Sequence, residues 1–498
     1  MLETAMQALV TVLDSTHILF MLLGILVGIT VGFLPGLGGP VGMSLLLPFI
    51  FGMDPTTGMG LLIGMVAVIH TADTFPSVLL GVPGSSGSQA TIMDGYPLAQ
   101  KGQAAKALGA AFFASAIGGL IGAVILFITI PIGRPLVLAF GSPELFMLSI
   151  LGLSMVGVLA GDSPVKGVLA GGLGMMLGTV GGAPATAEYR YTFDWLYLYS
   201  GIPLAVLALG LFALPEMIDL LANKKSIAGG KSLSGSRIEG VKDGIKNKWL
   251  IVRSGILGAV IGFIPGLGGS VVDWISYGVA KQTLKDTKDF GKGDIRGVIA
   301  PEGANNAKEG GALIPTMLFG IPGSGTTAIL LGGFILLGVQ PGPKMLTDNL
   351  DVTLSIVWTL AIANVFGAAV CFLLIKQIAK ISFIQANKLV PFLIVIMMVG
   401  AYQSTRHWGD LVFFILVGLL GWTMKHLDWP RAPLLVGFVL SLAAERYLHL
   451  SMSLYGWEWL THPMVLAIGA IIIVLLSMGF ILRKVSNKGR QDGGTSNE

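Results

Sequence analysis

The segment Leu79–Ser88 reads LLGVPGSSGS and interrupts a long apolar run with a cluster of Pro, Gly and Ser residues. A second copy, Leu318–Thr326, reads LFGIPGSGT and stands 239 positions later. A helix inside a bilayer has no water to satisfy freed backbone groups, so such breaks are tolerated only within protein or beside a polar cavity. The two segments therefore predict two discontinuous helices at equivalent places in the chain.

Each break follows an earlier motif that also occurs twice. Gly32–Gly39 reads GFLPGLGG and Gly262–Gly269 reads GFIPGLGG, 230 positions apart. Two different motifs that recur in the same order indicate a duplication. Their glycines permit positive φ angles and close backbone approach, which favours the tips of re-entrant hairpins at about Ile18–Phe51 and Trp249–Ala280. Ordinary turns outside the membrane are the alternative.

Composition restricts the class of protein. Of 498 residues, 53% are hydrophobic and 12% are charged, whereas soluble domains carry roughly 25% charged residues. The six His residues are scattered, there is one Cys, and the sequence contains no metal-ligand cluster, phosphate loop or nucleophile–base constellation. We therefore expect a polytopic membrane protein that is not an enzyme and has no cofactor.

Basic residues predict the orientation of the two copies. The segment between Ala222 and Leu250 contains seven Lys or Arg residues and two acids, which favours a cytoplasmic linker. Nucleic-acid binding is the competing interpretation, but no aromatic residues are interleaved. Residues 52–58, after the first PGLGG motif, include no basic residue, whereas Lys281–Arg296, after the second, includes five. Opposite bias predicts opposite orientation in the membrane.

The expected fold is an all-α polytopic membrane protein with two inverted-topology repeats, each containing a re-entrant hairpin and a discontinuous helix. Roughly 11 crossings accompany the two hairpins, with the N-terminus periplasmic and the C-terminus cytoplasmic. The discontinuous helices are expected at about Met59–Met93 and Gly311–Val339. The predicted domains are a first repeat at 1–222, a basic linker at 223–248, a second repeat at 249–482 and a disordered cytoplasmic tail at 483–498.

Matched helix breaks are typical of the binding site of a secondary transporter. The half-helix that begins after each break offers N–H groups and a positive dipole end to an anion. The half-helix that ends before it offers carbonyls to a cation such as Na⁺. Simple kinks, and helix capping by the asparagines, are the alternatives. The predicted substrate-binding residues are Gly84, Ser85, Ser86, Gly323, Ser324, Gly325, Thr326, Asn305 and Asn306.

A second set of residues is predicted to couple transport to an ion. His70 stands three residues before Asp73 on one helical face, and an ionisable residue inside a membrane is a functional candidate. A structural hydrogen-bonded pair is the alternative, and Asp273 allows the same two interpretations. Because the sequence shows no acid pair typical of a proton relay, Na⁺ is favoured over H⁺. The ion-coupling candidates are Gly36, Gly38, Gly266, Gly268, Asp73 and His70.

Three further motifs specify a family. Asp94–Ala99 reads DGYPLA, Pro301–Ala307 reads PEGANNA and Gln340–Pro343 reads QPGP. Together with the PGLGG motifs and the breaks, they closely resemble the large permease subunit (TctA family) of bacterial tripartite tricarboxylate transporters. The resemblance implies an inner-membrane importer of small di- or tricarboxylates that is driven by an ion gradient. It also implies two partners, a small integral membrane subunit and a periplasmic solute-binding protein.

The favoured function is a permease subunit that works by alternating access. A self-sufficient cation-coupled carboxylate symporter without a binding protein is the main alternative, and a homodimer is left open. A membrane-embedded enzyme would need an acid–base or metal constellation, and a channel or scaffold would not need paired breaks.

The topology can be tested by labelling single cysteines from outside intact cells, in a Cys371→Ser background. A cysteine at Ser232 or Ser236, in the predicted cytoplasmic linker, should stay unlabelled until the membrane is permeabilised. Strong labelling of either position in intact cells would refute the predicted orientation.

Overall fold

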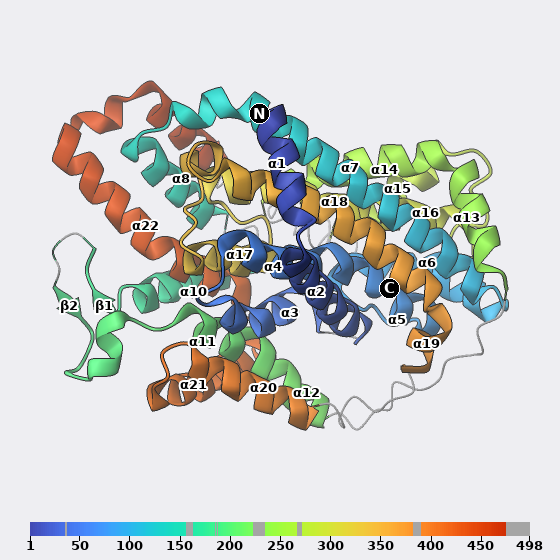
Figure 1. Ribbon diagram of the computed structural model, residues 1–498, viewed down its shortest axis with the longest axis horizontal. Coiled ribbons are helices and arrows are strands. Elements are labelled where there is room, and N and C mark those ends of the chain that lie inside the picture. Colours follow the sequence, from blue (N-terminus) through green and yellow to red (C-terminus); the bar gives the residue numbers. More distant parts are fainter. Residues whose placement is uncertain are drawn as a thin grey trace, which may run out of the picture. The chain divides into compact units, whose positions relative to one another are not determined.

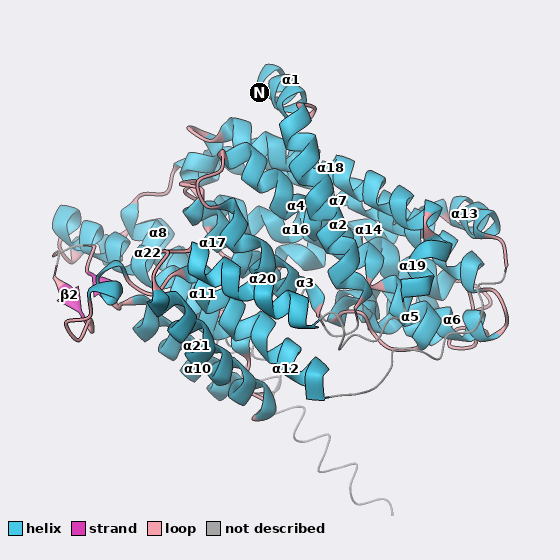
Figure 2. Cartoon of the chain, turned by 60° about the horizontal axis from the view of Figure 1, so that its bottom comes forward, coloured by secondary structure: helices cyan, strands magenta, loops and turns pink. Residues whose placement is uncertain are grey.

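The computed structural model describes the chain except for residues 35–36, 156–162, 185, 187, 223–234, 266–270, 382–389 and 475–498. The described part is almost entirely helical, with one short antiparallel pair formed by β1 (Gly181–Gly182) and β2 (Tyr189–Arg190) (Figure 2). Seven helical segments within it are long and apolar enough to cross a membrane. These observations confirm the all-α membrane class. The seven are Ser15–Phe33, Pro55–Leu80, Ala104–Leu138, Leu204–Leu221, Leu350–Leu373, Trp408–His426 and Arg431–Tyr455.

The chain forms two compact units, and each draws on both predicted repeats. Unit 1 comprises Met1–Leu138 and Ile202–Leu427, and unit 2 comprises Ala139–Gly201 and Asp428–Glu498. The helices of unit 2 are α8 (Ser142–Ser154), α10 (Pro164–Gly178), η3 (Leu196–Ser200), α22 (Arg431–Tyr455), η7 (Glu458–Thr461) and the segment Pro463–Val474. Within this unit α22 packs against α8 and α10.

Unit 1 contains both PGLGG motifs and both breaks. Its α-helices are labelled in Figure 1. Its first part consists of α1 (Leu2–Val12), α2 (Ser15–Phe33), α3 (Gly38–Leu46), η1 (Leu47–Ile50), α4 (Pro55–Ala72), α5 (Thr74–Leu80), η2 (Ser86–Ser88), α6 (Gln89–Gln100) and α7 (Ala104–Leu138). Its second part consists of α11 (Leu204–Ala208), the π-helical turn η4 (Leu209–Ala213), α12 (Leu214–Ala222), α13 (Arg237–Lys246), α14 (Lys248–Phe263), α15 (Val272–Thr283), α16 (Arg296–Phe319), α17 (Gly325–Leu336), η5 (Pro343–Leu346), α18 (Leu350–Leu373), α19 (Ile375–Ile381), α20 (Val390–Gln403) and α21 (Trp408–His426).

The two Pro-Gly-Ser segments interrupt the helical chain in the same way. Gly81 ends α5 with φ 67° and ψ 23°, and Gly320 ends α16 with φ 67° and ψ 20°. This left-handed conformation favours glycine, and it turns each N–H back to a carbonyl of the preceding helix. Ser85 and Ser324 then form capping boxes at the start of the next helical turn. Both motifs therefore end one helix and begin another.

The helices that lead to the two breaks are held by matching glycine contacts. Gly28 of α2 lies against α4, where a Cβ atom would be 2.7 Å from the Met65 carbonyl oxygen. Gly258 of α14 lies against α16, where a Cβ atom would be 2.3 Å from the Ala304 oxygen. Gly28 and Gly258 are 230 positions apart and Met65 and Ala304 are 239 apart, the two motif offsets. Small residues at these crossings let the backbones approach closely.

The second broken helix begins earlier than the sequence predicted. Residues from Arg296 onward already belong to α16, so the expected start at Gly311 is wrong. Asn305 and Asn306 consequently lie inside a continuous helix, and the alternative that they cap it is also wrong. The polar composition of this segment concealed a helix because its polar side chains are paired within the protein rather than exposed.

Two further elements differ from the expected boundaries. The sequence predicted separate crossings at about Ala107–Ile132 and Pro135–Ala160, but helix α7 continues through Pro131 and Pro135 to Leu138, so the predicted boundary between them is wrong. Part of the predicted linker is the helix α13, which packs on α7 and forms a 2.9 Å ion pair between Lys106 and Asp243. The remainder, 223–234, lies outside the described residues, as does the predicted tail.

Replacing Gly258 with Ala should lower the thermal stability of the detergent-solubilised protein. The added Cβ would overlap the Ala304 backbone, and such overpacking costs about 1–3 kcal/mol. Gly278 on α15 is the matched control, because no atom lies within 4 Å of its Cβ position. Gly278→Ala should leave the melting temperature unchanged or raise it, since Ala favours a helix over Gly. Equal losses for both variants would contradict the tight crossing.

Candidate functional site

The central feature of unit 1 is a buried histidine between two carboxylates. His70 of α4 places Nε2 3.0 Å from Glu309 Oε1 of α16 and Nδ1 3.3 Å from Asp73 Oδ2. His70 and Glu309 are 239 positions apart, the same offset that separates the two break motifs. All three side chains are almost fully buried.

Lys308 supplies a buried positive charge beside this histidine. Its Nζ lies 2.9 Å from Glu309 Oε1 and donates to Asn305 Oδ1 at 2.7 Å and to the Asn305 carbonyl at 3.2 Å. Only 3% of Lys308 is exposed to solvent. A buried charge requires a partner, because removing one member of a buried pair leaves the other uncompensated. Lys308 and Glu309 therefore form an ion pair in which each charge compensates the other.

The first break lies directly on this cluster. Ser85 donates a hydrogen bond to Asp73 Oδ2, and Gly84 packs so closely on Asp73 that a Cβ would lie 2.6 Å from its carbonyl oxygen. A Cβ at Gly87 would lie 2.4 Å from Asn305 Oδ1. A continuous polar chain thus runs from Ser85, which is half-buried, to Asn305 in the interior.

Three polar atoms in the cluster have no hydrogen-bond partner among the described residues. They are Asp73 Oδ1, Glu309 Oε2 and Asn305 Nδ2. An unpaired buried polar atom is costly, roughly 1–3 kcal/mol for a neutral group and more for a charged one. Two of these atoms are carboxylate oxygens, which accept hydrogen bonds, and the third is an amide nitrogen, which donates them, so the cluster keeps unused hydrogen-bonding capacity of both kinds.

Two buried carboxylates near this cluster, Glu302 and Asp273, form no ion pair among the described residues and accept hydrogen bonds from neutral donors. Glu302 of α16 accepts hydrogen bonds from Thr74, Thr91 and Ser115, which lie on three other helices. Asp273 of α15 accepts the Ala90 N–H at 2.9 Å, in the first turn of α6. Both residues hold the segment after the first break in place.

The second break has a different chemistry. Ser324 caps α17 through Thr327, and the neighbour of Gly323 is Ala312, where the first break has Asp73. Thr326 contacts the first PGLGG motif, since a Cβ at Gly39 would lie 2.2 Å from Thr326 Oγ1. This break therefore offers hydroxyl groups but no charge.

The predicted site residues divide accordingly. His70, Asp73, Gly84, Ser85 and Asn305 come together in the buried cluster. Asn306 belongs to another network and donates to Thr71 Oγ1 at 2.8 Å and Asn364 Oδ1 at 2.9 Å. The remaining candidates lie at the breaks or motifs: Ser86 is exposed, Gly323 is buried, Ser324 and Gly325 are half-buried, Thr326 is buried, Gly38 has φ 58°, and Gly36, Gly266 and Gly268 lie outside the described residues.

Sequence reasoning missed Lys308, Glu309 and Glu302. The signal was present, because three charged residues fall within the long Gly- and Ala-rich segment that ends at Phe319. It was masked by the assumption that the membrane-embedded part began only at Gly311.

The motif DGYPLA, by contrast, is explained structurally. Asp94 accepts hydrogen bonds from Tyr277 Oη and from the N–H groups of Gly291, Gly293 and Asp294.

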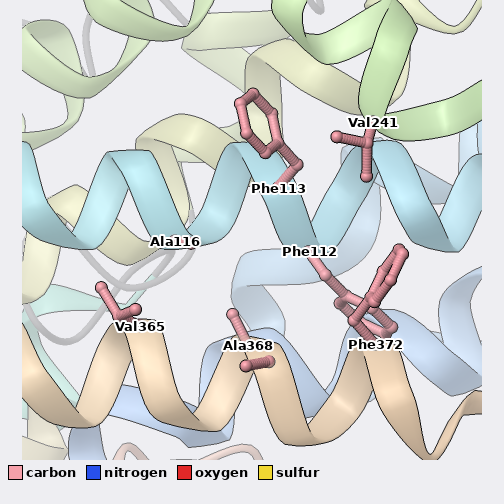
Figure 3. Close-up of a pocket in the computed structure, with 8 residues that line it drawn as sticks. Phe112, Phe113, Ala116, Val241, Val365, Ala368 and Phe372 are labelled. Atoms are coloured by element: carbon pink, nitrogen blue, oxygen red, sulfur yellow. The ribbon is translucent and has the colours of Figure 1, made fainter. Parts of the chain in front are cut away.

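An apolar cavity of about 220 Å³ lies elsewhere in unit 1, between α7, α13 and α18 (Figure 3). Aromatic and aliphatic side chains line it, including Phe112 and Phe113 of α7, Val241 of α13, and Phe372 of α18. It offers no charge to a polar ligand.

Comparisons with known proteins identify relatives across nearly the whole chain. The family model described as "Tripartite tricarboxylate transporter TctA family" matches residues 18–436. An uncharacterized 52.8 kDa protein in the TAR-I ttuC' 3'region of Agrobacterium vitis is 31% identical over 491 residues, 95% of this chain and 96% of the relative. An uncharacterized protein in the TAR-II ttuC' 3'region of the same organism is 30% identical over 233 residues, 46% of this chain and 96% of the relative. No solved structure matches the chain.

The different surroundings of the two break glycines give a direct test. Gly84→Ala should strongly lower the thermal stability of the solubilised protein, because the new Cβ would overlap Asp73 backbone atoms at 2.6–2.7 Å. Gly323→Ala should be tolerated, since its nearest neighbour would be the Ala312 Cβ at 3.2 Å. A melting-temperature loss at Gly323 equal to that at Gly84 would contradict this difference.

Proposed function

Because this chain belongs to the tripartite tricarboxylate transporter TctA family, we propose that it is the permease subunit of an ion-gradient-driven importer of small di- or tricarboxylates. Membership makes it a transporter component and not an enzyme, as the motifs predicted. The proposal adds the substrate class, delivery by a periplasmic binding protein, a small integral membrane subunit, and an inner-membrane location. The driving ion is a monovalent cation, Na⁺ or H⁺.

The observation that carries the proposal is the buried cluster at the first break. Lys308 and the Asn305 amide lie near a helix interruption at which Ser85 is half-buried and Ser86 is exposed. A lysine is a strong partner for a carboxylate, and hydrogen bonds between charged groups are about twice as strong as neutral ones. The serine hydroxyls at the break add further polar groups.

The matched geometry supports two inverted repeats at 1–222 and 249–482 that work by alternating access. Both breaks have the same glycine conformation and serine cap, and both leading helices have the same glycine crossings. The first PGLGG motif contacts the second break through Thr326, while Asp273, just past the second motif, binds the helix after the first break. Such reciprocal contacts suit repeats related by an axis in the membrane plane.

Uptake by cells that lack their own carboxylate importers tests the function. The permease, its small subunit and the binding protein should together accumulate [¹⁴C]citrate, [¹⁴C]malate or [¹⁴C]succinate. Omitting the binding protein should abolish uptake. Full uptake by the permease alone would favour the self-sufficient symporter, and no uptake of any carboxylate in the panel would contradict the proposed substrate class.

Ser85→Ala should raise the apparent KM about tenfold, because it removes the hydrogen bond that holds Asp73 at the break, and a hydrogen bond to a charged group contributes roughly 1.5–3 kcal/mol. Ser149→Ala in unit 2 is the control, since that hydroxyl binds only the Leu145 carbonyl of its own helix, at 3.0 Å. Initial uptake rates over a range of substrate concentrations measure both. An unchanged KM in Ser85→Ala would remove this serine from the binding site.

A further inference from the structure

His70 faces a negative group on each side. Its Nδ1 approaches Asp73 Oδ2 and its Nε2 approaches Glu309 Oε1, and an ionised carboxylate can only accept hydrogen bonds. A neutral imidazole has one N–H, so it can serve only one of the two contacts. Both are satisfied when one additional proton is present, on the imidazole or on a carboxyl group. The geometry therefore accommodates one such proton at rest, and Glu309 Oε2, which has no hydrogen-bond partner among the described residues, can take a second.

The charges around His70 come from few elements. Asp73 directly follows α4, the helix that carries His70, and Lys308 and Glu309 lie on α16. The next buried carboxylates are those of Glu302 and Asp273. Helices α2, α3, α5 and α17 also pack on α4 and carry no Asp, Glu, Lys or Arg. His17 of α2 instead binds Thr359 Oγ1 at 2.9 Å. The remaining charged residues on helices that contact α4 are Glu3 of α1, Lys106 and Arg134 of α7, Arg296 of α16 and Asp351 of α18, all near helix ends.

With an imidazolium at His70, the inner cluster is neutral, because Lys308 and His70 balance Asp73 and Glu309. A substrate carboxylate that binds the Lys308 ammonium group adds one negative charge and draws Nζ away from Glu309. A buried carboxylate without its cation is unfavourable. One proton on Glu309, hydrogen-bonded to His70, restores neutrality. No bond other than that to the proton forms or breaks.

We propose that the Lys308 ammonium group binds a substrate carboxylate. When this ammonium group moves from Glu309 to the substrate, the Glu309–His70 pair takes up a proton. This inference rests on the proposed transport function and makes the coupling ion H⁺. By linkage, a proton that favours carboxylate binding is itself bound more tightly when the carboxylate is present. The chain Ser85–Asp73–His70–Glu309 joins the half-buried break to this pair and provides the route for the proton.

The sequence-based preference for Na⁺ assumed that no acid pair was available. Asp73 and Glu309 are far apart in sequence but lie on the two sides of one imidazole ring. The Na⁺ preference stays a prediction, and the same experiment decides between the two ions.

The test uses proteoliposomes containing the complete system, with [¹⁴C]citrate and [¹⁴C]succinate as probes and an imposed pH or Na⁺ gradient. A pH gradient alone should drive accumulation in the wild type. Glu309→Gln and His70→Gln should each reduce this accumulation about tenfold or more, the loss expected for one hydrogen bond to a charged group. Both variants should retain exchange of internal for external substrate, because exchange requires no net proton movement.

Lys308→Met should lose accumulation and exchange alike, because it removes the anchor. Lys106→Met is the matched control, since that lysine pairs with Asp243 at 2.9 Å outside the cluster, and it should transport normally. The double variant Lys308→Met with Glu309→Gln removes both charges of the pair, so it controls for a folding defect caused by one unpaired charge. It should reach the membrane at wild-type levels and still fail to exchange.

Three outcomes separate the hypotheses. Accumulation driven by Na⁺ without a pH gradient would overturn the proton relay while leaving the transport function intact. Exchange by the double variant at wild-type rates would overturn the role of Lys308. Failure of the wild type to move either probe under any gradient would overturn the proposed carboxylate transport itself.

Discussion

The arrangement of unit 1 depends on one constraint: a charge in the interior of a membrane protein must meet an opposite charge or enough hydrogen bonds. Lys308 and Glu309 satisfy each other, and Glu309 also contacts His70 on another helix. That contact requires α4 and α16 to approach each other. The approach is possible because each helix is backed by a partner whose glycines admit a close crossing, α2 behind α4 and α14 behind α16.

The two breaks share a backbone but differ in side-chain chemistry. Gly84 and Gly323 occupy equivalent positions, yet the first packs on Asp73 and the second on Ala312. The same backbone conformation therefore interrupts two helices without specifying what each break binds. The polar groups differ: the carboxylate of Asp73 lies beside one break, and Lys308 and Glu309 lie on the helix that leads to the other. This asymmetry concentrates the charge on α4 and α16, the helices that lead to the breaks.

The breaks could be predicted from sequence because Pro and Gly act locally. Gly81 and Gly320 adopt φ 67° for a steric reason that is visible in the residue type alone. The charged cluster could not be predicted, because the pairing of His70 with Glu309 depends on how two distant helices pack. Asn305 shows the same limit: as an isolated amide it suggested a helix cap, whereas in the fold it accepts a hydrogen bond from Lys308. Local motifs predicted where the backbone changes direction, and tertiary contacts determined which side chains meet there.

The contacts between motifs also suggest how the halves influence each other. Gly39, in the first PGLGG motif, packs on Thr326 of the second break, and Asp273, after the second motif, binds the Ala90 N–H beyond the first break. A displacement at Gly39 would therefore disturb Thr326, and a displacement at Asp273 would disturb Ala90. Because Asp73 and Glu309 lie on opposite sides of His70, a shift of α4 relative to α16 also changes the hydrogen bonds of the same imidazole. Backbone movement and proton occupancy thus act on one group of atoms, which is the physical requirement for coupling them.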